Sequence, residues 1–193
     1  MVKANHERST LEQPSYEVLD THGSYELRDY FECSAVQIKI PGGRSHATRK
    51  GFNALYSYIS GNNRDRRTYA MTAPVIQQPE TFSAEDTSER NAVAALPEYW
   101  LVSFFLPAAT TAQTASAPND KRVELVSLPS CRVATLSFSG RWSDRNFQGA
   151  AARLKALLKE HKITTHGAFA YAFYDAPYVL PAQRHNEVHL AVS

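Results

Sequence analysis

The chain has 193 residues, which is enough for one sizeable domain with its own core and too few to indicate two. Charged residues make up 21% of it and the net charge is only +2, which gives no basis for binding nucleic acid through phosphate neutralisation. No apolar run approaches the roughly 18 residues of a membrane span, and the N-terminus lacks the apolar core of a secretion signal. These features predict a cytoplasmic protein, with a monomer as the default state.

The first part of the chain predicts a tail, a strand and a helix. Residues 1–14 are polar and aperiodic, so we expect a disordered tail followed by a single domain over 15–193. Residues 36–40 alternate apolar and polar side chains, the period-two pattern of a half-buried strand. After a break at 41–43, apolar residues recur at helical spacing over 51–59, which predicts an amphipathic helix.

The segment Met71–Val75 ends an apolar run with Pro74. Proline has no N–H to donate and its ring fixes φ, so it is disfavoured in an inner strand. We therefore expect a strand here that reaches a sheet edge or the rim of a cavity.

The second half predicts more strands and one more helix. Residues 79–97 and 108–119 are polar or of low complexity, and we expect loops, the second of them mobile. Cys33 and Cys131 begin apolar runs and lack metal-binding spacing, so buried free thiols are expected. The expected elements are strands at 99–106, 123–126, 131–138, 168–174 and 187–192, and a helix at 144–161 with Ser143 as its N-cap.

The two halves repeat one order of elements: strand, glycine-bearing break, amphipathic helix, strand. This order predicts an α+β fold with a pseudo-twofold repeat of a strand–helix–strand unit. Its curved antiparallel sheet would form an open, distorted barrel with two flanking helices. The concave apolar face of such a sheet is a place where small molecules bind.

Four segments in this order resemble the SOUL family of haem-binding proteins, and the resemblance runs from about Tyr16 to Val192. It implies the same open barrel. It also implies binding of haem or a related tetrapyrrole, a small planar apolar ligand, in a concave groove for transport, buffering or sensing. The segments that carry it are 24–30 (Ser-Tyr-Glu-Leu-Arg-Asp-Tyr), the helix and turn at 51–63, residues 67–75 and residues 184–188 (Arg-His-Asn-Glu-Val).

A flat apolar ligand favours aromatic and thioether contacts, and its carboxylates favour arginines at the mouth of the site. Each of these side chains could equally be ordinary core or surface. With this resemblance, the candidate cofactor-binding residues are Phe52, Tyr56, Arg67, Tyr69, Met71, Thr72, Pro74, Arg184 and Glu187.

Iron coordination would need a neutral imidazole pointing into the groove. In one branch of the family, the proposed ligand is a histidine just before the tyrosine that ends the Tyr-Glu-x-Arg-x-Tyr motif. Asp29 occupies that position here. The remaining candidate iron ligands are His46, just ahead of the first helix, and His189 in the last strand. Even if neither histidine binds iron, apolar burial and ion pairs between arginines and the propionates could still retain a porphyrin.

Glu187 also supports an alternative, a small-molecule hydrolase or isomerase that uses the same groove. If its strand face is concave, partial burial would raise the pKa of Glu187 and suit it to acid–base chemistry with His189 or Tyr171. This alternative follows a likeness to gyrase-inhibitor-type folds, some of which hydrolyse ligands with a pocket glutamate. A third hypothesis is a protein-interaction module that docks through the loops at 79–97 and 108–119. The chain has no nucleophile or phosphate-loop motif.

Overall fold

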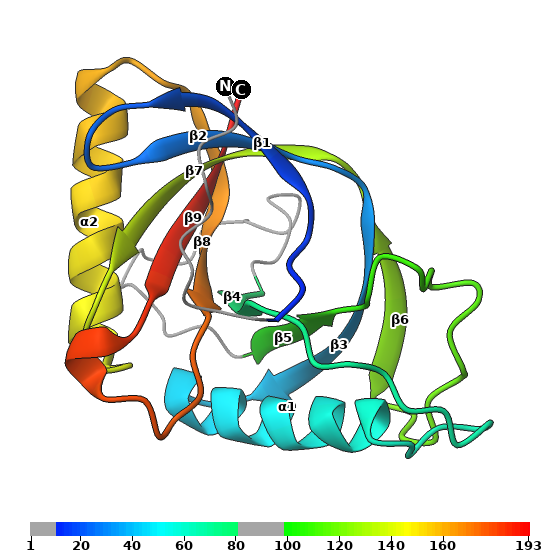
Figure 1. Ribbon diagram of the computed structural model, residues 1–193. Coiled ribbons are helices and arrows are strands. Elements are labelled where there is room, and N and C mark those ends of the chain that lie inside the picture. Colours follow the sequence, from blue (N-terminus) through cyan, green and yellow to red (C-terminus); the bar gives the residue numbers. More distant parts are fainter. Residues whose placement is uncertain (1–10, 81–98) are drawn as a thin grey trace, which may run out of the picture.

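A computed structural model describes residues 11–80 and 99–193. Within them, nine strands form one antiparallel sheet in the order β1-β2-β7-β9-β8-β4-β5-β3-β6. The sheet curls into an open barrel, as predicted (Figure 1). The strands are β1 (Tyr16–Thr21), β2 (Glu26–Tyr30), β3 (Cys33–Pro41), β4 (Val75–Pro79), β5 (Tyr99–Phe105), β6 (Val123–Leu128), β7 (Cys131–Phe138), β8 (Thr165–Phe173) and β9 (Asn186–Val192), and the helices are α1 (Arg44–Ile59) and α2 (Asp144–Glu160).

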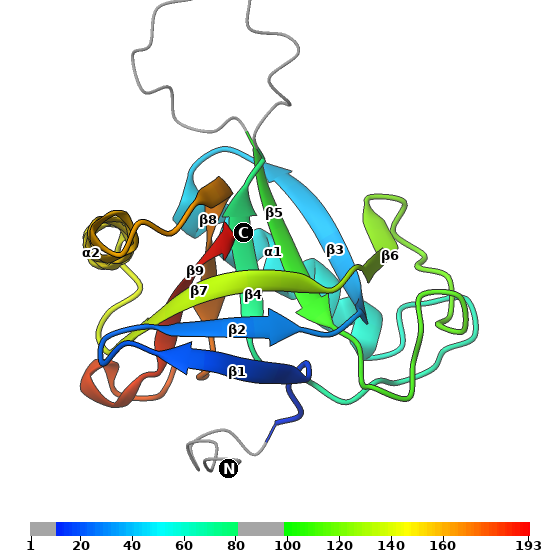
Figure 2. The same cartoon turned by 90° about the horizontal axis from the view of Figure 1, so that it is seen from above.

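Both helices pack on the outer face of the curved sheet, α1 against β3 and β5, and α2 against β7, β8 and β9 (Figures 1 and 2). Strand residues at alternate positions therefore point towards a helix and form the main core. On β3 these are Val36, Ile38 and Ile40, as the period-two pattern predicted. The other positions face the hollow of the barrel.

The predicted pseudo-twofold repeat is visible in the strand order. β3, β5 and β4 form one half of the central sheet, and β7, β9 and β8 form the other in mirrored order around the β4–β8 contact. Each half is completed by a strand from the other half, because β2 pairs with β7 and β6 pairs with β3. Neither half can close its part of the barrel alone.

Helix α2 begins where the sequence predicted, since the Ser143 side chain accepts a hydrogen bond from the Asn146 backbone N–H. Helix α1 begins at Arg44, earlier than the predicted residue 51. Its first turn carries few apolar residues and is anchored instead by Arg44, whose buried guanidinium donates to the Trp142 carbonyl and pairs with Asp144. None of the described helices is long and apolar enough to cross a membrane.

Of the two alternatives predicted for Met71–Val75, the sheet edge was wrong, whereas Thr72 of this segment does line a hollow. β4 begins at Val75, after the proline, and lies between β5 and β8, so it is an inner strand. Pro74 precedes the ladder, where its missing N–H interrupts no strand pairing. The preceding residue, Ala73, donates its N–H to the Glu12 carbonyl at 2.9 Å, and Glu12 forms a bridge with Thr72. Residue 12, expected in the tail, thus contacts the barrel, and residues 1–10 lie outside the described part.

Two further expectations change. The loop at 108–119, expected to be mobile, is held in place through the Ser116 backbone. The Ser116 carbonyl accepts a hydrogen bond from the Tyr58 hydroxyl, and the Ser116 N–H donates to the Tyr69 hydroxyl. Cys131 is exposed and Cys33 is only partly buried, because both stand at the first position of a strand. Of the loop at 79–97, residues 81–97 lie outside the described residues.

Candidate functional site

The concave face carries one deeply buried carboxylate, that of Glu187 on β9, whose side chain is 1% exposed. Val188 and Leu190 of this strand join the core beneath α2. Because side chains alternate along a strand, Glu187 and His189 point to the opposite, concave face. Ser137 of β7 lies directly across from Glu187 in the sheet register.

Arg28 of β2 reaches Glu187 with two parallel hydrogen bonds. Its Nη1 lies 3.0 Å from Oε2 and its Nη2 lies 3.0 Å from Oε1, the bidentate geometry that suits a guanidinium and a carboxylate. Arg28 is itself buried, donates from Nε to Glu26, and stands 4.6 Å from the centre of the Tyr16 ring. The pair is therefore shielded from solvent on both sides.

Four more groups surround the Glu187 carboxylate. The Tyr174 hydroxyl donates to Oε2 at 2.7 Å and the Ser137 hydroxyl to Oε1 at 3.0 Å. His185 Nε2 lies 3.0 Å from Oε1 and His189 Nε2 lies 2.8 Å from Oε2. Since an ionised carboxylate only accepts, both histidines must carry a proton on Nε2. Their Nδ1 atoms are therefore the ring nitrogens left for another partner.

This environment sets the protonation of the cluster. Burial alone would raise the pKa of Glu187, but hydrogen bonds from His185 and His189, together with the charge of Arg28, bring that pKa well below its usual value. Burial likewise favours neutral Arg28, yet the Glu187 carboxylate raises the pKa of Arg28 above its ordinary value. Burial and the Glu187 charge raise the pKa of Tyr174 well above 10, so this hydroxyl remains a donor.

The expected raised pKa of Glu187 was thus wrong, because the sequence did not show which cations the fold brings to it. The grouping with Tyr171 was also wrong. Tyr171 pairs with Val188 and Gln77, and its ring lies against Trp100 and Phe147 on the helix-covered face. It is on the opposite side of the sheet from Glu187.

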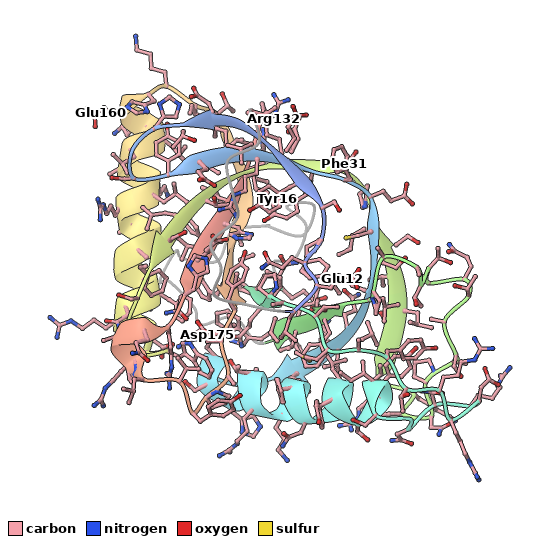
Figure 3. The ribbon with its side chains drawn as sticks, in the orientation of Figure 1. Glu12, Tyr16, Phe31, Arg132, Glu160 and Asp175 are labelled. Atoms are coloured by element: carbon pink, nitrogen blue, oxygen red, sulfur yellow. The ribbon has the colours of Figure 1, made fainter. Side chains whose placement is uncertain are left out.

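Asp29, at the position of the family's proposed iron ligand, points away from the barrel hollow. It alternates with Arg28 and Tyr30, and its carboxylate accepts two hydrogen bonds from Arg132, at 2.7 and 2.9 Å. Figure 3 shows Arg132 on the outside of the curve and Tyr16 within it. These hydrogen bonds lower the pKa of Asp29, whose carboxylate is partly exposed.

The two candidate iron ligands lie far apart in the fold. His46 is an exposed residue in the first turn of α1, on the outside of the barrel, and not ahead of the helix as expected. His189 faces the concave side, where its ring lies 6.1 Å from that of Tyr30. Only His189 of this pair therefore borders the hollow.

The predicted cofactor-binding residues do not converge on one place. Phe52 and Tyr56 stack on each other along α1, where Phe52 contacts Phe104 of the core layer and Tyr56 is 52% exposed. Arg67 lies in the exposed loop after α1. Tyr69 stacks on the core residue Tyr58.

The other predicted residues are divided between two regions. Met71 packs against the main core, and Pro74 is buried at the start of β4. Thr72 is buried and donates its hydroxyl to the Phe105 carbonyl at 2.7 Å. Arg184 lies over the Trp142 ring in the connection between β8 and β9. Of the whole predicted set, Glu187 lies at the centre of the concave cluster.

Sequence reasoning missed Arg28, Ser137, Tyr174 and His185. Arg28 belongs to the Tyr-Glu-x-Arg-x-Tyr motif and His185 directly precedes the Asn-Glu-Val segment, so both lay inside segments already singled out. Their joint role depends on the pairing of β2 with β7 and of β7 with β9. No local pattern encodes that pairing.

An apolar cluster adjoins these polar groups on the concave face. Ala73, Ala172 and Tyr174 are buried together, with Ile76 packed against them, and this cluster is separate from the main core. Ile76 lies across from Ala172 in β8 and Ser103 in β5, so it faces the hollow. Ala73, Ile76, Ala172 and Tyr174 thus form an apolar floor on the concave face, and the Tyr174 hydroxyl links this floor to the Glu187 cluster.

A hollow of about 310 Å³ lies at the other end of this face. It is lined by the segment 12–15, residues 32–34 at the start of β3, residues 105–108 at and after the end of β5, and Thr110, Thr111, Gln113 and Ser127. Thr72, one of the predicted cofactor-binding residues, also lines it. Burial raises the pKa of the Cys33 thiol in its wall to about 11, so this thiol is protonated at neutral pH. The volume is at the lower end of the range for small-molecule sites.

Comparison with known proteins places this chain in a family. Residues 11–191 match the SOUL heme-binding protein family, and the chain belongs to it. No curated protein matches the chain by sequence.

Solved structures with a similar fold cover most of the chain. The EcmrR C-terminal domain has a TM-score of 0.65 at 10% identity, over 92% of this chain and 98% of that one. An uncharacterized conserved protein from Listeria innocua has a TM-score of 0.62 at 14% identity, and a Listeria innocua hydrolase 0.58 at 12%, each over 88% of this chain and 92% of its own. At these identities, the likeness concerns the fold alone.

Proposed function

We propose that the protein binds haem or a related tetrapyrrole on the concave face of its sheet. Membership of the SOUL heme-binding family supports ligand binding of this kind at the level of the family. The observation that carries the proposal is the concave cluster itself, in which an apolar floor adjoins two histidines held by one buried carboxylate. An apolar macrocycle with carboxylate substituents matches both parts of this surface.

The described side chains suit such a ligand in a particular way. Ile76 would contact the macrocycle, because it is the partly exposed member of the apolar floor, whereas Ala172 and Tyr174 are buried. A histidine ligand to metal commonly donates its other ring N–H to a carboxylate, as His185 and His189 do to Glu187. Their Nδ1 atoms would be the candidates for iron, of which His189 is the one we propose. The guanidinium of Arg28 already donates to Glu187 and Glu26, so it is not free to pair with the carboxylates of the ligand. Apolar contacts with the macrocycle would therefore dominate binding.

A hemin titration followed by the Soret band tests this proposal. The natural chain should give a saturable one-to-one shift. Ile76→Arg places a long charged side chain on the floor and should weaken binding at least about tenfold, since it replaces an apolar contact worth about 1.5–3 kcal/mol. Leu19→Arg, on exposed β1, is the matched control and should leave affinity unchanged.

Iron coordination is a separate outcome of the same titration. His189→Ala should alter the position of the Soret band if His189 ligates the metal, whereas His46→Ala should not, because His46 lies on the outside of α1. If neither substitution changes the Soret band, the haem site would stand but His189 would not be the iron ligand. The absence of a saturable shift in the natural chain would overturn the proposal as a whole.

The second candidate function is hydrolysis or isomerisation of a small apolar substrate by Glu187 with His189. Its supporting observation is the burial of both on the concave face. Because the pKa of Glu187 is lowered and its oxygens are fully engaged, the carboxylate is a weak base and would serve to orient His189. A panel of ester and epoxide substrates that shows no turnover sensitive to Glu187→Gln would exclude this role.

A further inference from the structure

The connection between β8 and β9, residues 174–185, is a closed and internally bonded loop. Val179 N–H donates to the Ala176 carbonyl at 3.0 Å, and Gln183 N–H to the Leu180 carbonyl at 2.8 Å. At its base, His185 N–H donates to the Asp175 side chain. In Figure 1 this loop lies at a corner of the molecule beside the first turns of α1 and α2, and Figure 3 labels Asp175 there.

Arg184 holds the inside of this loop. Its Nε donates to the Val179 carbonyl at 2.9 Å and its Nη2 to the Pro177 carbonyl at 2.6 Å. Its guanidinium stands 4.4 Å from the centre of the Trp142 ring, so the loop is tied to the segment ahead of α2. A second tie runs from Gly140 N–H to the Pro181 carbonyl at 2.9 Å. The loop is thus ordered before any partner arrives.

This ordered loop presents two large apolar side chains to solvent. Tyr178 is 88% exposed and Leu180 is 64% exposed, the highest values among large hydrophobic residues in the described part of the chain. Tyr178 and Leu180 are separated by Val179 alone and lie in an exposed turn. Because the loop is already ordered, burying them in a partner would cost little conformational entropy.

The segments next to the two residues carry more positive than negative side chains. Arg141 and Arg145 are exposed in the segment that the loop contacts through Gly140. Of the two acidic residues nearby in sequence, Asp144 pairs with Arg44, and Asp175 accepts the His185 N–H and keeps its negative charge. The loop therefore presents Tyr178 and Leu180 and contacts a segment that carries two exposed arginines.

We propose that this loop docks the protein on an anionic lipid surface. Tyrosine is favoured at the boundary between headgroups and acyl chains, and a leucine beside it can enter the acyl region. Arginines near the surface interact with anionic headgroups over about one Debye length. A fluid lipid interface can surround a projecting turn with two apolar side chains without needing a preformed pocket.

Co-sedimentation with lipid vesicles tests this inference and does not depend on haem. The purified chain should bind vesicles of phosphatidylcholine with phosphatidylserine, and bind pure phosphatidylcholine much less. Tyr178→Ala and Leu180→Ala should each weaken binding about tenfold. Tyr56→Ala is the matched control, because Tyr56 is another exposed aromatic residue, on α1, and it should have no effect.

The contribution of charge is tested with Arg141→Ser/Arg145→Ser. This double variant should lose affinity for anionic vesicles only, and the loss should shrink at high salt because screening weakens the same contacts in the natural chain. All four positions are exposed, so an unchanged Tm should confirm folding. The proposal is overturned if the natural chain binds neither vesicle, if binding survives Tyr178→Ala/Leu180→Ala, or if these residues instead capture a protein partner.

Discussion

Arg28 and Glu187 form a bidentate pair across an intervening strand, because β7 lies between the β2 and β9 strands that carry them. The pair joins residues 159 positions apart in the chain. It connects the first strands of the domain to the last one, on the concave face where we place the ligand. The same contact therefore supports both the closure of the barrel and the geometry of the site.

Removing one partner of this pair should be costly. Glu187→Leu leaves a buried guanidinium without its carboxylate and should reduce the free energy of unfolding by about 3–5 kcal/mol. The double variant Arg28→Met/Glu187→Leu should lose less than the two single variants added together, since it leaves no unpaired charge. Urea unfolding measures all three. Strictly additive losses would show that the pair is not energetically coupled.

The lowered pKa of Glu187 predicts how stability depends on pH. The unfolded chain, with an ordinary glutamate pKa of about 4.3, takes up this proton before the folded protein does. The ionised Glu187 carboxylate therefore contributes fully to the free energy of unfolding above about pH 4.3, and this contribution is lost as the pH falls towards the lower pKa of Glu187 in the folded state. Urea midpoints measured down to acidic pH should fall more steeply for the natural chain than for Glu187→Gln. Glu124→Gln, at an exposed position, should reproduce the natural curve.

Gly51 lies where α1 packs closely against the sheet. A Cβ at this position would lie 2.7 Å from the Val102 side chain on β5, so Gly51→Ala must push the helix outwards. We expect a loss of about 1–3 kcal/mol, even though alanine favours helix. Gly149→Ala in α2 is the control, because its Cβ meets nothing and it should stabilise by about 0.5–1 kcal/mol. Equal effects at both positions in urea unfolding would contradict this packing.

The N-cap of α2 offers a local test. Ser143→Ala removes the acceptor of the Asn146 N–H and should reduce the free energy of unfolding by about 1 kcal/mol. Ser143→Asp keeps an acceptor and should stay within a few tenths of the natural value. Thermal or urea unfolding can compare the two. A loss as large for aspartate as for alanine would mean that the side chain does not act as a cap.

Much of the fold could be predicted from local patterns. The alternation at Val36–Ile40 gave a strand buried on one face, and Ser143 with the following apolar spacing located α2. Both signals concern neighbouring residues, where backbone geometry alone sets which side chains share a face. The first turn of α1 escaped this reasoning because Arg44 is anchored by Trp142 and Asp144, which are distant in sequence.

The sequence by itself determined the family, the curved α+β barrel and the inward position of Glu187 as one of two alternatives. Only the tertiary structure decided between those alternatives, and it set the pKa of Glu187 low by bringing Arg28, His185 and His189 to one carboxylate. It also moved Tyr171 and His46 away from that carboxylate. The physical reason is that the energy of a buried charge depends on which partners surround it. Those partners are set by the pairing of strands that are far apart along the chain.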